Sequence, residues 1–159
     1  MSRRHPGSRS QQAAFTITEI LIAVAIVGVL AAIALANYEK YVERTRVNQA
    51  IVDIASMSVL IVKYADDNRA FPETLADAKL GGRIDPWGRP YVYTDLTSVK
   101  GKGSARKDKR LNPLNSDFDL YSVGKDGDSR MPLAAKVSQD DVIRARDGRF
   151  VGLAKDFDP

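Results

Sequence analysis

The chain has 159 residues, a formal net charge of +4 at pH 7 and no cysteine. Its length fits one small globular domain plus a membrane segment, and the missing cysteines exclude disulfides, thiolate metal sites and cysteine nucleophiles. Three of the 24 basic residues lie in the first 14 positions, and the 21 that remain face 20 acidic residues, so the overall charge gives no reason to expect a nucleic-acid partner.

Residues 1–14 read MSRRHPGSRSQQAA and contain three arginines and no acid. They predict a basic leader that stays in the cytoplasm, because positive charge before an apolar segment holds that end inside and sends the rest outward. The domain formed by residues 37–159 would then be periplasmic. His5, the only histidine, lies in this leader, so the rest of the chain has no imidazole for a catalytic triad or a zinc site. We expect no enzyme activity.

The segment Phe15–Ala36 is apolar apart from Glu19. As a helix its 22 residues would span ~33 Å, enough for a bilayer core of ~30 Å. An acid inside such a segment costs roughly 2.5 to 3.5 kcal/mol at the bilayer centre, so Glu19 has a partner or a functional reason, unless it is an acid that reaches the membrane boundary and is tolerated there. A secretory signal is the alternative, because Ala34-Leu35-Ala36 is an A-x-A-like cleavage site, but its apolar core is normally only about 7 to 15 residues long.

The helix is predicted to continue from Asn37 to about residue 69, since no Gly or Pro follows Ala36 until Pro72. Residues with spacings of four and three define one face that packs on the domain. They are Val47, Ile51, Ile54, Ser58, Ile61 and Ala65.

The remainder, residues 84–159, predicts a small sheet with loops. Turn signals at Asp85-Pro86 and Gly88 precede a strand at 91–94, and a second strand follows at 118–123. Between them, the basic residues from Lys100 to Arg110 have no aromatic neighbour on which a base could stack, so they predict a solvated loop.

The run FTITEILIAVAIVGVLAAIALANYEKY resembles the amino-terminal segment of type IV prepilins, the family that includes type IV pilins and the pseudopilins of type II secretion. This resemblance implies that prepilin peptidase cuts between Ala14 and Phe15 and that Phe15 is then N-methylated. It also implies that Glu19 pairs with the amino-terminal ammonium of an adjacent subunit during assembly. Ala14 departs from the family pattern, which usually has Gly before the cut.

Two further blocks, DPWGRPYVY and DLYSVGKDG, are similar to the soluble domain of the major pseudopilins. They imply an α+β, pilin-like fold in which one long N-terminal helix packs on a small antiparallel β-sheet, with a C-terminal loop region.

The same likeness implies a calcium ion in the carboxy-terminal loop, held by Asp126 and a backbone carbonyl of Val123. Calcium takes about 6 to 8 oxygen ligands, and further oxygens are available nearby. These candidates are Asp128, Ser129, Asp140 and Asp141. The alternative is a solvated acidic turn followed by a helix that Asp140 or Asp141 caps and that leads into VIRAR.

The resemblance implies a structural subunit that forms a helical homopolymer. Its partners would be prepilin peptidase, other pseudopilins and the secretion platform in the bacterial inner membrane. A type IV pilin or minor pilin, used for adhesion, motility or DNA uptake, is the nearest alternative. A calcium-binding module on an uncleaved anchor, or released after Ala36, belongs to a different class.

Overall fold

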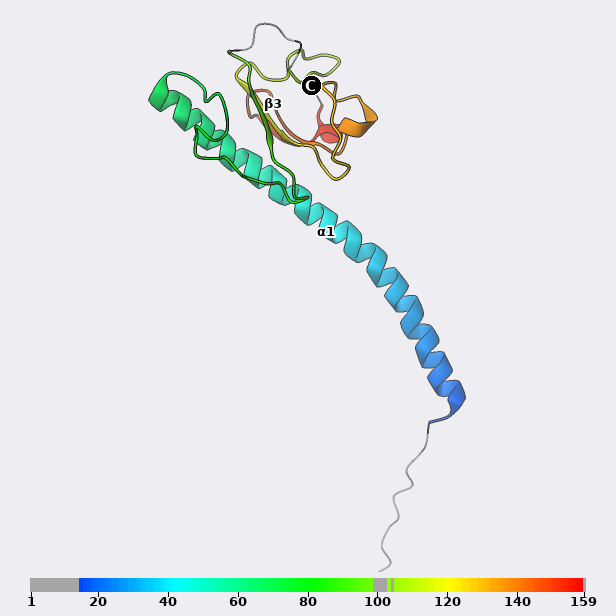
Figure 1. The fold of residues 1–159 in the computed structure, drawn as a ribbon. Helices are drawn as coiled ribbons and strands as arrows, with labels where there is room; N and C mark the ends of the chain where they lie inside the picture. The colour runs from blue at the N-terminus through cyan, green and yellow to red at the C-terminus, as the bar shows by residue number, and fades with distance from the viewer. Residues whose placement is uncertain (1–14, 99–102, 104, 159) are drawn as a thin grey trace, which may run out of the picture. The chain divides into compact units, whose positions relative to one another are not determined.

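The computed structural model describes residues 15–98, 103 and 105–158, and of Ala36 the backbone alone. The described residues form one α-helix, α1 (Ile17–Asn68), and four strands (Figure 1). The strands are β1 (Val92–Asp95), β2 (Phe118–Ser122), β3 (Val142–Ala145) and β4 (Phe150–Leu153), with short 3-10 helices η2 (Lys136–Ser138) and η3 (Ala154–Asp156). The chain divides between Tyr41 and Val42 into two units.

The first unit carries the amino-terminal part of α1. This part of the helix is long and apolar enough to cross a membrane, with a mean hydropathy of 2.7 in its most apolar window. The helix passes through Ala36 and continues without interruption to Asn68. The prediction of one continuous helix ending near residue 69 is therefore confirmed.

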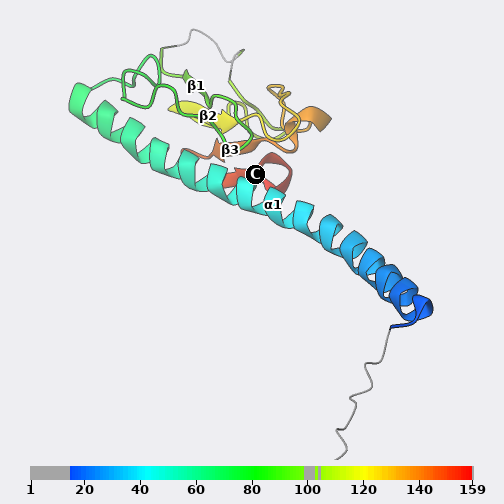
Figure 2. The same ribbon diagram turned by 60° about the horizontal axis from the view of Figure 1, so that its bottom comes forward.

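In the second unit, the rest of α1 lies along one face of the sheet (Figure 2). Its most deeply buried side chains are Ala50, Ile54, Met57 and Ile61, each fully buried at spacings of four and three. Ile54 and Ile61 belong to the predicted face, whereas Ala50 and Met57 were not in it. The observed buried face is therefore rotated slightly from the predicted one. Ser58 lies at its margin and donates its hydroxyl hydrogen to the Ile54 carbonyl (2.7 Å).

The sheet is antiparallel, with the strand order β1-β2-β3-β4. Val92 lies opposite Tyr121, Tyr121 opposite Ile143, and Ala145 opposite Phe150. The two predicted strands correspond to β1 and β2. The alternative of a helix after Asp141 is wrong, because residues 142–145 form β3 and pair on both sides.

Side chains of the sheet alternate between two hydrophobic clusters. Phe118, Leu120 and Val142 face the helix, while Tyr121 and Ile143 face the opposite side. Loops cover that opposite cluster, together with the carboxy-terminal Phe157, whose ring lies 5.1 Å from that of Phe150. Because both faces are covered, the central strands β2 and β3 are buried along their whole length.

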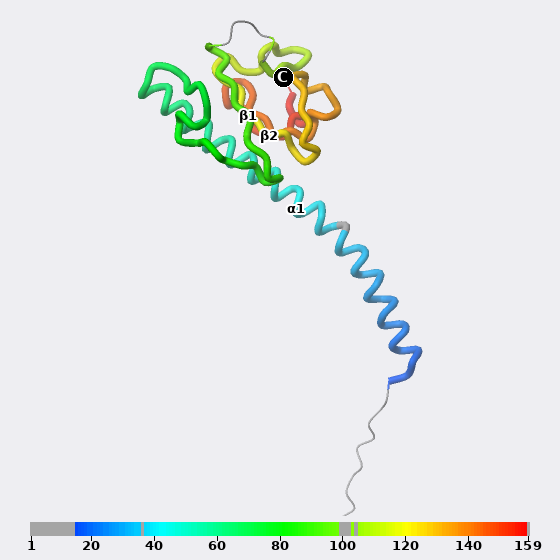
Figure 3. Tube along the Cα trace, in the orientation of Figure 1, coloured from blue at the N-terminus to red at the C-terminus, as the bar shows by residue number. Residues whose placement is uncertain are grey.

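The connection from α1 to β1 runs back alongside the helix (Figure 3). Phe71 and Leu75 pack against the helix-side cluster, and Leu80 is buried within it. The Tyr93 hydroxyl donates a hydrogen bond to the Pro72 carbonyl (2.8 Å), which joins the start of this connection to β1.

Candidate functional site

The amino-terminal end of α1 is closed by a hydrogen-bonded box between Thr16 and Glu19. The Thr16 main-chain N–H and hydroxyl each donate to Glu19 Oε2 at 2.8 Å, and the Glu19 N–H donates to Thr16 Oγ1 at 3.2 Å. Thr16 immediately precedes the helix and Glu19 is its third residue, which is the arrangement of a capping box. Glu19 thus satisfies donors that the first helical turn would leave unpaired.

Capping leaves the negative charge of Glu19 unneutralised. No described residue forms an ion pair with it, and Phe15, the predicted new amino terminus, lies two peptide units before the helix with 81% of its surface exposed. Ala14 lies outside the described residues. The structure therefore brings Phe15 and Glu19 to one end of the helix and leaves the carboxylate available to a cation from another chain.

The helix surface beyond Glu19 is uniformly apolar and exposed. Every large side chain from Ile20 to Leu35 has more than half of its surface uncovered, including Leu21 at 65% and Val24 at 65%. Such a surface is stable only against lipid or against other apolar helices.

The second predicted site is the turn after β2. Residues near Asp85 form hydrogen bonds with the end of β2 and with the first residues of this turn. The buried Asp85 carboxylate accepts the Trp87 and Arg89 N–H groups (3.0 and 2.8 Å) and the Ser122 hydroxyl hydrogen (2.5 Å). The Arg89 guanidinium then donates to the carbonyls of Gly124 (2.7 Å) and Lys125 (3.3 Å). The blocks DPWGRPYVY and DLYSVGKDG are therefore bonded to each other.

Two of the predicted calcium ligands, Asp126 and Asp140, lie together. The Asp126 N–H donates to Asp140 Oδ2 (2.9 Å), and Asp126 Oδ1 accepts the Asp128 N–H (2.9 Å). Asp126 and Asp128 are exposed, and Val123 and Asp140 are half-buried. These contacts fold the turn back on itself.

The other two side chains of the predicted set, Ser129 and Asp141, are engaged by an arginine. Asp141 is fully buried, and its Oδ2 accepts hydrogen bonds from Arg106 Nη2 (2.6 Å) and from Ser129 Oγ (2.6 Å). Arg106 Nη1 also donates to Ser129 Oγ (2.7 Å). Burial raises the pKa of Asp141 to about 6, although the neighbouring guanidinium opposes this shift.

Arg106 corrects one prediction about the basic loop. The residues from Lys100 to Arg110 were predicted to be solvated, but Arg106 is only 2% exposed. Lys107, Lys109 and Arg110 are exposed as expected, and Lys100 and Lys102 lie outside the described residues. The sequence carried no signal for this difference, because Arg106 has the same local surroundings as its exposed neighbours.

The predicted calcium ligands therefore fall into two groups, a folded acidic turn and a buried carboxylate that already has a cation. Within the described ranges, no three acidic, histidine or cysteine side chains are placed to hold one metal ion. The side chains as arranged do not fit a single calcium site. Calcium binding itself stays a prediction.

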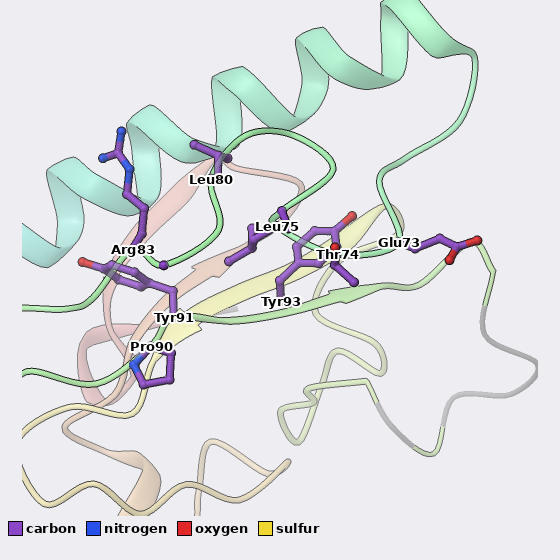
Figure 4. Close-up of a pocket in the computed structure, with 10 residues that line it drawn as sticks. Glu73, Thr74, Leu75, Leu80, Arg83, Pro90, Tyr91 and Tyr93 are labelled. Atoms are coloured by element: carbon purple, nitrogen blue, oxygen red, sulfur yellow. The ribbon is translucent and has the colours of Figure 1, made fainter.

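A pocket of about 340 Å³ lies between the connection 73–83 and β1 (Figure 4). None of the predicted site residues lines it. Its two tyrosines use their hydroxyls within the fold, since Tyr91 donates to Asp53 Oδ2 (2.9 Å) and Tyr93 donates to Pro72. Burial raises the pKa of both hydroxyls, so they remain protonated and offer no nucleophile.

Comparisons with known proteins found one motif near the amino-terminal end of the chain and several related proteins. Residues 9–35 match the prokaryotic N-terminal methylation motif. The chain is 30% identical to the type II secretion system core protein G of Pseudomonas aeruginosa, in an alignment that covers 75% of this chain and 87% of that protein. It is 25% identical to the core protein G of Aeromonas hydrophila (76% and 88% covered) and 26% identical to a fimbrial protein of Neisseria meningitidis (86% and 81%). No solved structure gives a significant match.

Proposed function

Because the chain belongs to the type IV prepilin-like family, with type II secretion core proteins G and type IV pilins among its relatives, we propose that it is a structural subunit of a secretion pseudopilus. The observation that carries this proposal is the exposed apolar surface of α1, which begins at a capped carboxylate. The named relatives are secretion-system and pilus proteins, and no enzyme activity is proposed.

Processing is proposed to occur between Ala14 and Phe15. The match of residues 9–35 to the methylation motif supports this position, since it spans the end of the leader, the proposed cut and nearly all of the apolar segment. The subunit would wait in the inner membrane with its amino terminus in the cytoplasm and its domain in the periplasm, because the arginines precede the apolar segment.

Glu19 is proposed to set the register of assembly. Removal of the leader creates an ammonium on Phe15. In a bundle of apolar helices, this ammonium and the Glu19 carboxylate would each carry a high free-energy cost unless the two charges pair. Thr16 supplies hydrogen bonds to Glu19 but no positive charge. The Phe15 ammonium of an incoming subunit would neutralise the Glu19 carboxylate, so a helix out of register would leave both charges unpaired.

A type IV pilin is the second candidate, and the Neisseria meningitidis fimbrial protein favours it by matching the larger share of this chain, 86%. The two candidates share processing and assembly and differ in the machine they serve. Co-purification with the inner-membrane secretion platform supports the pseudopilin, whereas long fibres on the cell surface support the pilin.

The test of the assembly mechanism separates the charge of Glu19 from its capping role. Glu19→Gln keeps an acceptor for the Thr16 donors, as the capping box allows Glu or Gln, but removes the charge. Glu19→Ala removes both. We expect both variants to accumulate as processed subunits in the membrane and both to fail to form filaments, measured by shearing and electron microscopy. Normal filaments from Glu19→Gln would show that capping, and not charge, is what assembly requires.

A further inference from the structure

We propose that Arg106 supplies, from within the chain, the positive charge that a calcium ion would otherwise provide, so that the carboxy-terminal loop is closed by a guanidinium and folds without the metal. The inference concerns the domain alone and does not depend on filament assembly.

Arg106 is held at its main chain and at the two terminal nitrogens of its guanidinium, whereas its buried Nε has no hydrogen-bond partner among the described residues. Its main-chain N–H donates to Asp119 Oδ2 (2.7 Å), and its carbonyl accepts the Leu114 N–H (2.9 Å). The guanidinium carbon lies 4.2 Å from the centre of the Tyr121 ring, a distance suited to a cation–π contact. The position of the charge is therefore fixed by β2 and by the preceding loop.

The guanidinium connects two segments that the chain separates. It bonds Ser129, at the end of the acidic turn, and Asp141, directly before β3. Beside it, the Lys107 N–H donates to the Met131 carbonyl (3.1 Å), and the Leu133 N–H donates to the Lys107 carbonyl (3.0 Å). Arg106 thus ties Ser129 and Asp141, on either side of residues 130–140, to one point, which is the structural task expected of a bound cation.

Charge excludes a second cation at this point. Calcium ligands lie at about 2.4 Å from the ion, so an ion on Asp141 would lie only a few ångströms from the guanidinium that already contacts Oδ2 at 2.6 Å. Arg106 and Asp141 neutralise each other in a site where both are buried. Adding a divalent ion would leave an excess of positive charge there, which the neighbouring Asp140 would offset only in part.

A second arginine bonds two backbone carbonyls of the same turn, although not that of Val123, which is the carbonyl predicted to bind calcium. Backbone carbonyls are favoured calcium ligands, and those of Gly124 and Lys125 are held by the Arg89 guanidinium. The turn 124–129 is therefore bonded to a guanidinium at its start and to another at its end. Both of these guanidinium groups belong to the chain itself.

The arrangement also predicts what the loss of Arg106 would uncover. Asp141 Oδ1 is buried with no hydrogen-bond partner among the described residues, and Oδ2 depends on Arg106 and Ser129. Without the guanidinium, the Asp141 carboxylate and the Ser129 hydroxyl would lose the positive charge beside them. We expect such a variant to become responsive to calcium, because a metal ion could then replace the missing charge.

The test uses the full chain in detergent, with thermal unfolding followed by the fluorescence of Trp87, the only tryptophan, which lies in the domain. Melting is compared in excess EGTA and in calcium at about 10 mM, well above the ~1 mM upper range of extracellular calcium sites. We expect the same Tm in both conditions for the wild type. Arg106→Ala should melt lower by roughly 10 °C or more in EGTA and regain part of that loss in calcium.

Lys109→Ala is the matched control, because it removes an exposed basic residue of the same loop and should melt like the wild type in both conditions. A saturable rise in the wild-type Tm with calcium would overturn the proposal, and its loss in Asp126→Asn would locate the metal in the acidic turn. An Arg106→Ala variant that melts at the same temperature as the wild type would also overturn the proposal. If Arg106→Ala fails to fold, Arg106→Lys retains the charge and should remain indifferent to calcium.

Discussion

At the residue scale, the domain buries an ion pair whose two charges offset each other. Arg106 and Asp141 are 2% and 0% exposed and are joined by a contact of 2.6 Å. Removing one partner of such a pair leaves an uncompensated buried charge, whereas replacing both by apolar side chains is often close to neutral. The pair therefore fixes the loop in one arrangement more than it adds net stability.

We predict that Asp141→Leu lowers the free energy of unfolding by about 3 to 5 kcal/mol, because it strands the Arg106 guanidinium. Arg106→Met should cost a similar amount. The double variant should recover most of the loss, and urea unfolding followed by Trp87 fluorescence measures all three. Costs that simply add in the double variant would mean that the two side chains act independently.

The pKa of Asp141 predicts that its contribution to folding stability increases as the pH falls, which is the opposite of the usual behaviour of a paired carboxylate. Burial raises this pKa from the ordinary 3.8 to about 6, and the charged or polar groups facing the carboxyl are Arg106, Ser129 and Asp140. Between pH 6 and pH 4 the folded chain binds a proton at Asp141 that the unfolded chain does not, so this group contributes more stability as the pH falls and loses that contribution as the pH rises through 6.

The measurement is the difference in free energy of unfolding between the wild type and Asp141→Asn, which cannot titrate. We expect the difference to favour the wild type more at pH 4.5 than at pH 7. A difference that grows with pH would show that attraction by Arg106 outweighs burial.

At the element scale, the helix was predictable and half of the sheet was not. The apolar run, and the absence of Gly and Pro between Ala36 and Pro72, were enough to predict the extent of α1. β3 reads VIRA and is buried on both faces, so it lacks the alternation that marks a strand. Its Arg144 is tolerated because Asp117 binds it with two contacts (2.7 and 2.6 Å) that no local pattern reveals.

One local signal for the missing hairpin was present in the sequence. Asp147-Gly148 lies between β3 and β4, and such pairs favour tight hairpin turns. In the structure, Arg146 and Asp147 have positive φ angles of 53° and 56°, and the Asp147 N–H donates to Asn115 Oδ1 (2.9 Å). The turn could therefore have been predicted, although the asparagine that supports it, 32 positions away, could not.

Two residues of α1 test the position of its buried face. Met57 is fully buried, and Val59 is 69% exposed. We predict that Met57→Ala lowers the free energy of unfolding by about 2 to 5 kcal/mol, through lost burial and a residual cavity. Val59→Ala should stay within about 0.5 kcal/mol of the wild type. Equal effects in urea unfolding would contradict the packing of α1 on the sheet.

At the scale of the whole molecule, the two units differ in whether the chain itself buries their apolar side chains. Both hydrophobic clusters are formed within residues 42–159, whereas the helix surface from Ile17 to Leu35 is not covered by the chain itself. The sequence was sufficient to predict this difference, because it depends on composition along one helix. It was not sufficient for the carboxy-terminal loop, where Arg106 meets partners 23 and 35 positions away.

The central claim is that the chain is a processed filament subunit, and the state of its amino terminus tests that claim most directly. The measurement is the intact mass and amino-terminal peptide of the protein recovered from its native membrane. The account predicts a chain that begins at N-methylated Phe15. A chain that begins at Asn37 would indicate a released soluble domain, and one that retains Met1 would indicate a permanent anchor; either result would contradict the account.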